Sequence, residues 1–119
     1  METEEFSMAD KTSTQRIVLH LRGNLGRTLV AYIAGTRSEK DVQRWINGAT
    51  PDSAQYKRLK FAYDLLTAVA SSESMGVAKA WLIGSSIDGG ESSPAEAIRN
   101  GRFKAARTSS EQMIRDDWM

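Results

Sequence analysis

The sequence predicts an all-α protein, and three observations indicate this class. Apolar residues recur every three or four positions along most of the chain. Glycine, and helix-capping residues such as serine and threonine, separate these stretches. No stretch alternates apolar and polar residues for long, as a half-buried strand would. The 119 residues, 40% of them hydrophobic, suffice for one compact domain or two small helical lobes that share a core.

The first two helices are each expected to end at a glycine, because glycine readily adopts the left-handed conformation found after helices. The first begins near Thr12 or Ser13 and stops at Gly23, and the second stops at Gly35. Residues 1–12 precede them as a flexible acidic segment. The positions expected to face the core are Ile17, Val18, Leu21, Leu29, Val30 and Ile33.

The third and fourth helices are recognised by their capping residues. Ser38 begins the third as an N-cap, with Asp41 placed to complete a capping box, and Gly48 ends it. The fourth helix is the longest, with Thr50 as its cap and Pro51 in its first turn. Their apolar stripes consist of Val42, Trp45, Ile46, Tyr56, Leu59, Ala62, Tyr63, Leu66, Val69 and Ala70.

After the fourth helix the sequence becomes richer in serine and glycine. We expect a hinge, a short apolar helix over residues 75–84, a polar loop, a helix that Ser93 caps and Gly101 ends, and a final helix over about residues 103–115. The expected regions are a helix-turn-helix bundle with a long connecting helix, residues 13–70, and a small C-terminal helical domain, residues 71–119.

The composition excludes several classes of protein. The absence of cysteine rules out thiol catalysis, disulfides and thiolate metal sites, and it suits a reducing compartment. The first residues are acidic and polar, unlike a signal peptide. No apolar run approaches the ~18 residues that a membrane span needs. We therefore expect a soluble cytoplasmic protein.

The net charge of +1 conceals an uneven distribution. Residues 1–10 contain four acids and no Lys or Arg. Residues 11–60 contain ten Lys and Arg against three acids, a net charge of +7, whereas residues 61–119 have a net charge of −2. A basic half joined to a mildly acidic half suggests two functions, one of them directed at a polyanion. An ordinary solvated helical face accounts for the same charges equally well.

The stretch "LVAYIAGTRSEKDVQRWING" has the composition of a helix-turn-helix motif. That motif needs a small residue in its first helix, a glycine in the turn and an apolar pair in its second helix. Ala31 or Ala34, then Gly35, and then Val42 with Trp45 meet these needs. Val42 lies seven positions after Gly35, one more than is usual. Either the turn is longer by one residue or Gly35 is not the turn glycine.

The second helix of this motif would expose side chains suited to DNA. Arg, Lys, Gln and Asn hydrogen-bond base edges in the major groove, and residues at the helix start can meet a backbone phosphate. The predicted DNA-binding residues are Arg37, Ser38, Lys40, Gln43, Arg44 and Asn47, and further phosphate contacts are open to Arg27, Lys57, Arg58 and Lys60. Packed helices with solvated outer faces are the alternative interpretation.

Catalysis is not expected. His20 is the only histidine and lies among apolar residues of the first helix, where a packed imidazole is commoner than a general base. Asp116 and Asp117 are adjacent and would point in different directions on a helix. No phosphate-binding or dinucleotide-binding glycine motif is present. We expect no metal site and no cofactor. The apolar chain end, Trp118 and Met119, instead suits recognition of a protein.

The segments "RWING" and "AKAWLIGSSIDGGESSPAEAIRNGRF" resemble the Xre/MbcA/ParS antitoxin family. Members of that family join an N-terminal helix-turn-helix to a C-terminal domain. This domain has a tryptophan and a leucine at a helix end, a polar loop, and a short helix that a proline opens and a glycine closes. Here these features are Trp81 with Leu82, residues 85–93, Pro94 to Asn100, and Gly101. The resemblance covers about residues 20–110.

The resemblance implies a function based on binding alone. Members hold a RES-domain toxin, which consumes NAD, in an inhibited complex, and they bind operator DNA to repress their own operon. The toxin-binding residues that it implies are Trp81, Pro94, Arg99, Arg102 and Trp118. A homodimer or a larger toxin–antitoxin assembly is expected, since paired half-sites add their contacts. A phage or prophage repressor without a toxin, or a scaffold module, remains an alternative.

Overall fold

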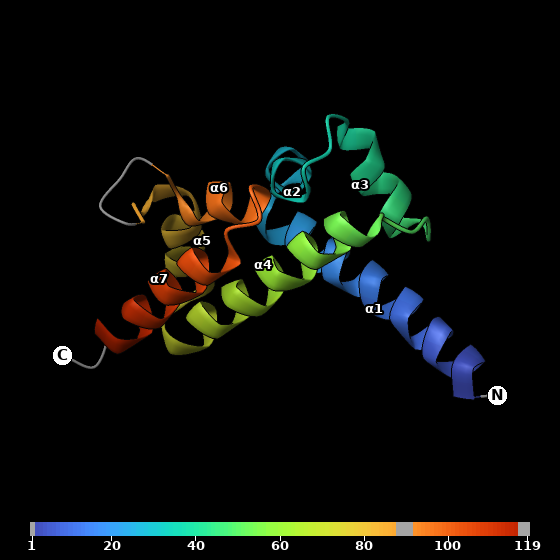
Figure 1. Cartoon of the computed structure of the whole chain (residues 1–119), viewed down its shortest axis with the longest axis horizontal. Helices are drawn as coiled ribbons and strands as arrows, with labels where there is room; N and C mark the ends of the chain where they lie inside the picture. The colour runs from blue at the N-terminus through green and yellow to red at the C-terminus, as the bar shows by residue number, and fades with distance from the viewer. Residues whose placement is uncertain (1, 88–91, 117–119) are drawn as a thin grey trace. The chain divides into compact units, whose positions relative to one another are not determined.

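The computed structural model describes the backbone of residues 2–87 and 92–116, and the side chains of residues 13–87 and 92–115. This part of the chain forms seven α-helices and no strand (Figure 1). The predicted all-α class is thereby confirmed. Among the helices of these residues, none is both long enough and apolar enough to span a membrane.

Packing divides the chain into two units, residues 1–60 and residues 61–119. The division falls inside the fourth helix, α4 (Ser53–Ser72). The expected division lay later, after residue 70, where the composition of the sequence changes. The second part of α4 belongs with the helices that follow it, and Phe61 packs against Phe103 with ring centroids 4.6 Å apart.

The first unit contains α1 (Glu2–Leu25), α2 (Arg27–Ala34), α3 (Glu39–Ile46) and the beginning of α4. α1, α2 and α3 all contact one another, so that their apolar faces enclose one core. The buried hydrophobic residues of this unit are Ile17, Val18, Leu21, Leu25, Val30, Ala31, Ile33, Ala34, Val42, Trp45 and Leu59. Of the core positions predicted for the first two helices, only Leu29 is half-buried rather than buried.

α1 is longer than predicted at both ends. It begins at Glu2, ahead of the predicted start near Thr12 or Ser13, so residues 2–12 are helical. Gly23 lies within α1 and does not end it. A glycine inside a helix costs only about 0.5–1 kcal/mol relative to alanine, which the buried apolar face of α1 can offset. The helix stops instead before Gly26, whose φ of 88° breaks the helical path.

The start of α4 also differs from the prediction. The helix begins at Ser53, and its cap is Asp52 rather than Thr50. The Asp52 carboxylate accepts from the Gln55 N–H (2.8 Å), and Gln55 Oε1 accepts from the Asp52 N–H (2.9 Å). This reciprocal pair is a capping box. Pro51 precedes the helix and is buried.

The second unit contains the remainder of α4, α5 (Met75–Gly84), α6 (Pro94–Arg99) and α7 (Phe103–Asp116). The last three helices agree with the predicted ranges. α6 contacts both α5 and α7. Ser93 caps α6 as predicted, with its Oγ accepting from the Glu96 N–H (3.1 Å). The buried hydrophobic residues of this unit are Ala62, Leu65, Leu66, Val69, Ala78, Trp81, Leu82, Ile87, Ala95, Ala97, Ile98 and Ala106.

Candidate nucleic-acid interface

The turn between α2 and α3 is built on Gly35. This residue adopts the left-handed conformation, with φ 84° and ψ 22°. Its N–H donates to the Tyr32 carbonyl (3.1 Å), and the Thr36 N–H donates to the Ala31 carbonyl (3.1 Å). These two bonds form a Schellman motif, which satisfies carbonyls at the end of α2. Gly35 is therefore the turn glycine, and its unusual spacing to Val42 reflects a longer turn.

Side chains of this turn bond to the start of α3. Ser38 is the N-cap, as predicted, and its Oγ accepts from the Lys40 N–H (3.2 Å). The second half of the predicted capping box is wrong, because the Asp41 carboxylate accepts from the Thr36 hydroxyl and not from the Ser38 backbone. The Ser38 N–H donates to Thr36 Oγ1 instead (3.3 Å). The longer turn thus inserts Thr36 between the two expected partners.

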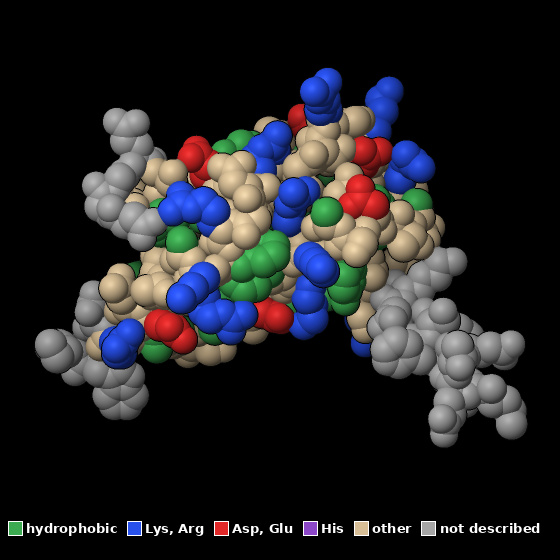
Figure 2. Space-filling model, viewed as in Figure 1, with side chains coloured by type: hydrophobic (Ala, Val, Ile, Leu, Met, Phe, Trp, Pro, Cys, Tyr) green, Lys and Arg blue, Asp and Glu red, His purple; other side chains and the backbone are tan. Residues whose placement is uncertain are grey.

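α3 buries one face and exposes the other. Val42 is fully buried and Trp45 is 4% exposed, and they anchor the helix in the core of the first unit. In Figure 2, Lys and Arg side chains project from the surface over α3. We define the α3 surface as the six predicted DNA-binding residues, of which Ser38 and Gln43 are half-buried and the others exposed: Arg37, Ser38, Lys40, Gln43, Arg44 and Asn47. The structure brings all six to α3 and its two ends.

Acidic residues reduce the positive charge of the α3 surface. Arg44 Nη1 lies 3.1 Å from Asp41 Oδ1, and Arg27 Nε lies 4.0 Å from Glu39 Oε1. Ion pairs at such exposed positions contribute about 0–1 kcal/mol, so a nucleic acid can replace them at small cost. Glu39 and Asp41 already complement the positive end of the α3 dipole. A phosphate at the helix start would consequently depend on Arg37.

A residue of α1 reaches the α3 surface. Arg22 Nη1 donates to Gln43 Oε1 (3.1 Å), and Gln43 Nε2 donates to Asn47 Oδ1 (3.1 Å). The oxygen and the nitrogen of the Gln43 amide thus each have a hydrogen-bond partner. Sequence reasoning missed Arg22, because a contact between residues 21 positions apart leaves no local pattern. The available signal was a long polar side chain directly after Leu21 of the buried stripe.

The four additional cations predicted to meet phosphates are of two kinds. Arg27, Lys57 and Lys60 are exposed. Arg58 is half-buried, and its Nη1 donates to the Ala34 carbonyl at the end of α2 (3.0 Å). Arg58 is therefore part of the support of the turn, and a phosphate would have to compete with that carbonyl.

The residues implied for toxin binding differ in exposure. Trp81 is 3% exposed and its Nε1 donates to Ser109 Oγ (3.0 Å), while Pro94 is fully buried. Arg99 is half-buried and Arg102 is exposed. Trp118 lies outside the described residues. Of the described residues in this set, the two arginines are accessible at the surface, whereas Trp81 and Pro94 belong to the core of the second unit.

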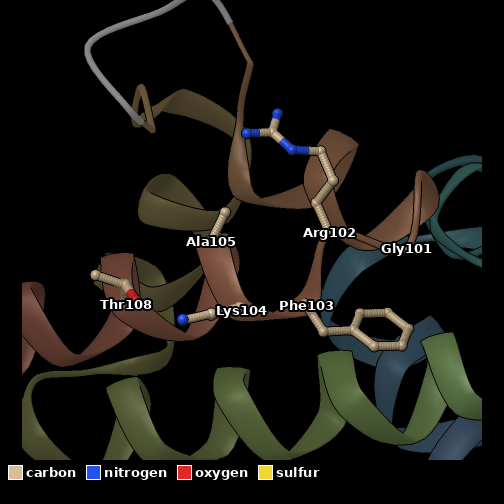
Figure 3. A pocket seen from close by; sticks show the side chains of 6 residues that line it. All are labelled: Gly101, Arg102, Phe103, Lys104, Ala105 and Thr108. Carbon is tan, nitrogen blue, oxygen red and sulfur yellow. The ribbon is translucent and has the colours of Figure 1, made fainter.

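A shallow cavity of about 460 Å³ lies at the start of α7. The Arg102 side chain extends away from the body of α7, and Phe103 points in another direction (Figure 3). The guanidinium carbon of Arg107 lies 5.1 Å from the centroid of the Phe61 ring, a cation–π contact. The residues that line the cavity are Gly101, Arg102, Phe103, Lys104, Ala105 and Thr108.

Comparison of the chain with models of protein families, with curated proteins and with solved structures finds no match. Within the described ranges, no group of three or more His, Asp or Glu residues is placed to hold a metal ion.

Proposed function

We propose that the chain is a cytoplasmic, DNA-binding antitoxin. Its first unit inserts α3 into the major groove of operator DNA and represses transcription of its own operon. Its second unit binds and inhibits a RES-domain toxin that consumes NAD. The chain itself contributes no catalytic group and no cofactor.

One observation carries the DNA-binding half of this proposal: α2 and α3 are joined by the Gly35 turn, with Val42 and Trp45 buried and the α3 surface turned outward. An α-helix with its side chains is about 10–12 Å across, and the major groove is about 12 Å wide. Lys40, Gln43 and Arg44 have the donors and acceptors that read base edges.

Two observations support a protein partner for the second unit. The first is the resemblance over about residues 20–110, which is a similarity of short motifs. The second is a local concentration of positive charge in a half whose net charge is −2. Residues 99–107 contain Arg99, Arg102, Lys104 and Arg107 and no acid. Such a cluster suits a partner with an acidic surface, since complementary charge speeds association and suppresses wrong partners.

A homodimer is part of the proposal. α3 has only 8 residues and can contact few base pairs. Two copies bound to half-sites about 34–36 Å apart would add their contacts, which is how helix-turn-helix proteins reach useful affinity.

The DNA-binding half is tested with Arg44→Ala. We expect this variant to lose about 1–3 kcal/mol of affinity for its own promoter, because arginine is the side chain that most often reads guanine. Binding is measured by fluorescence anisotropy at physiological salt, with a scrambled duplex for comparison. Lys79→Ala, which removes an exposed cation of α5, is the matched control and should bind as the wild type does. Equal affinities for all three proteins would refute the assignment of Arg44.

The toxin-binding half is tested by purifying the tagged protein from its native locus. We expect a stoichiometric partner encoded by the neighbouring gene, identified by mass spectrometry, whose NAD consumption appears only after separation from the antitoxin. Exchanging Arg102 and Lys104 together for Glu should reduce the recovery of that partner, whereas Lys79→Glu should not. Recovery of the protein alone, or with promoter DNA only, would favour a free-standing phage or prophage repressor.

A further inference from the structure

We propose that Arg22, on α1, is a positioning residue that fixes the amide of Gln43 for reading one adenine–thymine base pair. This inference rests on the proposed function, since it requires α3 to enter the major groove. It goes beyond the α3 surface because Arg22 lies on a different helix and would itself touch no base.

The hydrogen bonds around Gln43 define which end of its amide is which. A guanidinium has only donors, so Arg22 can bond only to the carbonyl oxygen, Oε1, at 3.1 Å. Asn47 Oδ1 accepts from the other end, Nε2, also at 3.1 Å. Arg22 and Gln43 are both half-buried, which shields their bond from competing water.

Without Arg22, the Gln43 amide would be free to turn over. The last torsion of a glutamine side chain has a broad, nearly two-fold profile, so its oxygen and nitrogen exchange places easily. In this structure such a rotation would set the N–H groups of Gln43 against those of Arg22. A bond with a charged donor is roughly twice as strong as one between neutral groups, which makes the observed orientation the preferred one.

The amide retains the capacity to bind a base. A glutamine side chain has two acceptor lone pairs and two donor hydrogens. Arg22 occupies one lone pair of Gln43 and Asn47 accepts one hydrogen, so one acceptor and one donor remain. In the major groove, adenine presents a donor at N6 and an acceptor at N7. The fixed amide therefore matches adenine in one orientation only.

The experiment selects bound sequences from a pool of randomised double-stranded oligonucleotides and reads the base preference at each position by sequencing. We expect the wild type to prefer adenine at one position by about 5- to 150-fold, as for a single bidentate contact. Arg22→Met keeps the aliphatic length but removes the donors, and it should lose the preference at that position only. Gln43→Ala should lose the same position, and the double variant should add no further loss.

Matched variants separate positioning from folding. Arg16→Met removes an exposed cation from the same helix and should select the wild-type motif. Gln43→Glu keeps the acceptor for Arg22 but replaces the donor, and its preferred base should change from adenine to cytosine at that position. Arg22→Lys keeps a charged donor at the same position and should retain the adenine preference, so it tests the role of Arg22 even if Arg22→Met does not fold.

The outcomes distinguish this inference from the proposed function. A wild type that selects no motif would overturn DNA reading itself. A wild type that selects a motif, with Arg22→Met selecting the same motif at equal strength, would overturn the role of Arg22 alone. So would different positions lost in Arg22→Met and Gln43→Ala.

Discussion

At the scale of single residues, the lack of a side chain at Gly35 and the position of the Arg58 guanidinium depend on each other. A Cβ placed on Gly35 would lie 2.7 Å from Arg58 Nη1, the atom that donates to the Ala34 carbonyl. The turn thus requires glycine for two reasons: the backbone is left-handed, with φ 84°, and the guanidinium occupies the space of a side chain. No other described glycine combines both constraints.

Gly35→Ala is expected to lower the free energy of unfolding by about 2 kcal/mol. The left-handed backbone accounts for about 1–2 kcal/mol, and displacement of Arg58 from the Ala34 carbonyl adds about 0.5–1.5 kcal/mol. Urea denaturation followed by circular dichroism measures the change. Gly23→Ala is the control, because a Cβ there meets nothing within 4 Å in a helix, and it should stabilise the protein by about 0.5–1 kcal/mol. Changes of the same sign would contradict this explanation.

The sequence predicts which side chains are exposed better than it predicts which atoms those side chains bond to. Amphipathic spacing correctly separated buried Val42 and Trp45 from the exposed residues of the α3 surface. The roles of Arg22 and Arg58 did not follow, because both are long cations whose acceptors lie 21 and 24 positions away. Charge indicates that such side chains approach the surface, but only the packed helices determine which oxygen they reach.

At the scale of the helices, boundaries were predictable where a cap had no competitor. Ser93, Pro94 and Gly101 defined α6 without ambiguity. At α4, Thr50 and Asp52 were both suitable caps. The deciding feature is the residue three positions later: Gln55 can reach back to Asp52, whereas the corresponding residue for Thr50 is a serine. The sequence itself therefore favours Asp52 over Thr50 as the cap.

The contact of α5 with α7 is tested by Ser109→Ala. Trp81 is 3% exposed and its indole N–H donates to Ser109 Oγ, so the variant leaves a buried donor without its partner. This costs about 1–3 kcal/mol, reduced by about 0.5 kcal/mol because alanine favours helices more than serine. Thermal unfolding should therefore show a lower midpoint. Thr108→Ala, at an exposed position of the same helix, should leave the midpoint unchanged or raise it. A similar midpoint for both variants would exclude a contribution from the indole bond.

At the scale of the whole chain, charge is the property most directly tied to the proposed function. The segment with a net charge of +7, residues 11–60, coincides with most of the first unit. A protein that neutralises phosphates releases the counterions condensed on DNA, so its affinity depends steeply on salt.

The salt dependence of DNA binding should show that the side chains that neutralise phosphates lie in the first unit. We expect Lys57→Ala to weaken binding to all duplexes alike and to reduce the slope of log K against log salt by about 1, as for the loss of one phosphate contact. Titrations at several salt concentrations give this slope. Lys79→Ala, in the second unit, should leave the slope unchanged. A slope that responds to Lys79 and not to Lys57 would place the electrostatic contact elsewhere.

The two-part organisation was predictable from composition, but the position of the division was not. Serine and glycine after residue 70 indicated a boundary there. The helix α4 nevertheless contributes to both units, since its first part contains Arg58 and its second part contains Phe61. A change in composition marks the residue at which a helix ends. A packing unit ends instead where the side chains begin to contact a different set of helices, and this position depends on the fold.

The shortness of α3 has a consequence for how the proposed DNA binding would depend on temperature. A helix of 8 residues is too short to persist alone in water, where about 12–15 residues are needed even for favourable sequences. α3 is held by Gln15 and Arg22 of α1, and it lies inside the loop that Arg58 closes onto Ala34. The residues that we propose to read DNA would thus lose their arrangement as soon as the first unit opens. Occupancy of the operator would then follow the folded fraction of that unit, and derepression on warming would be a property of the protein itself.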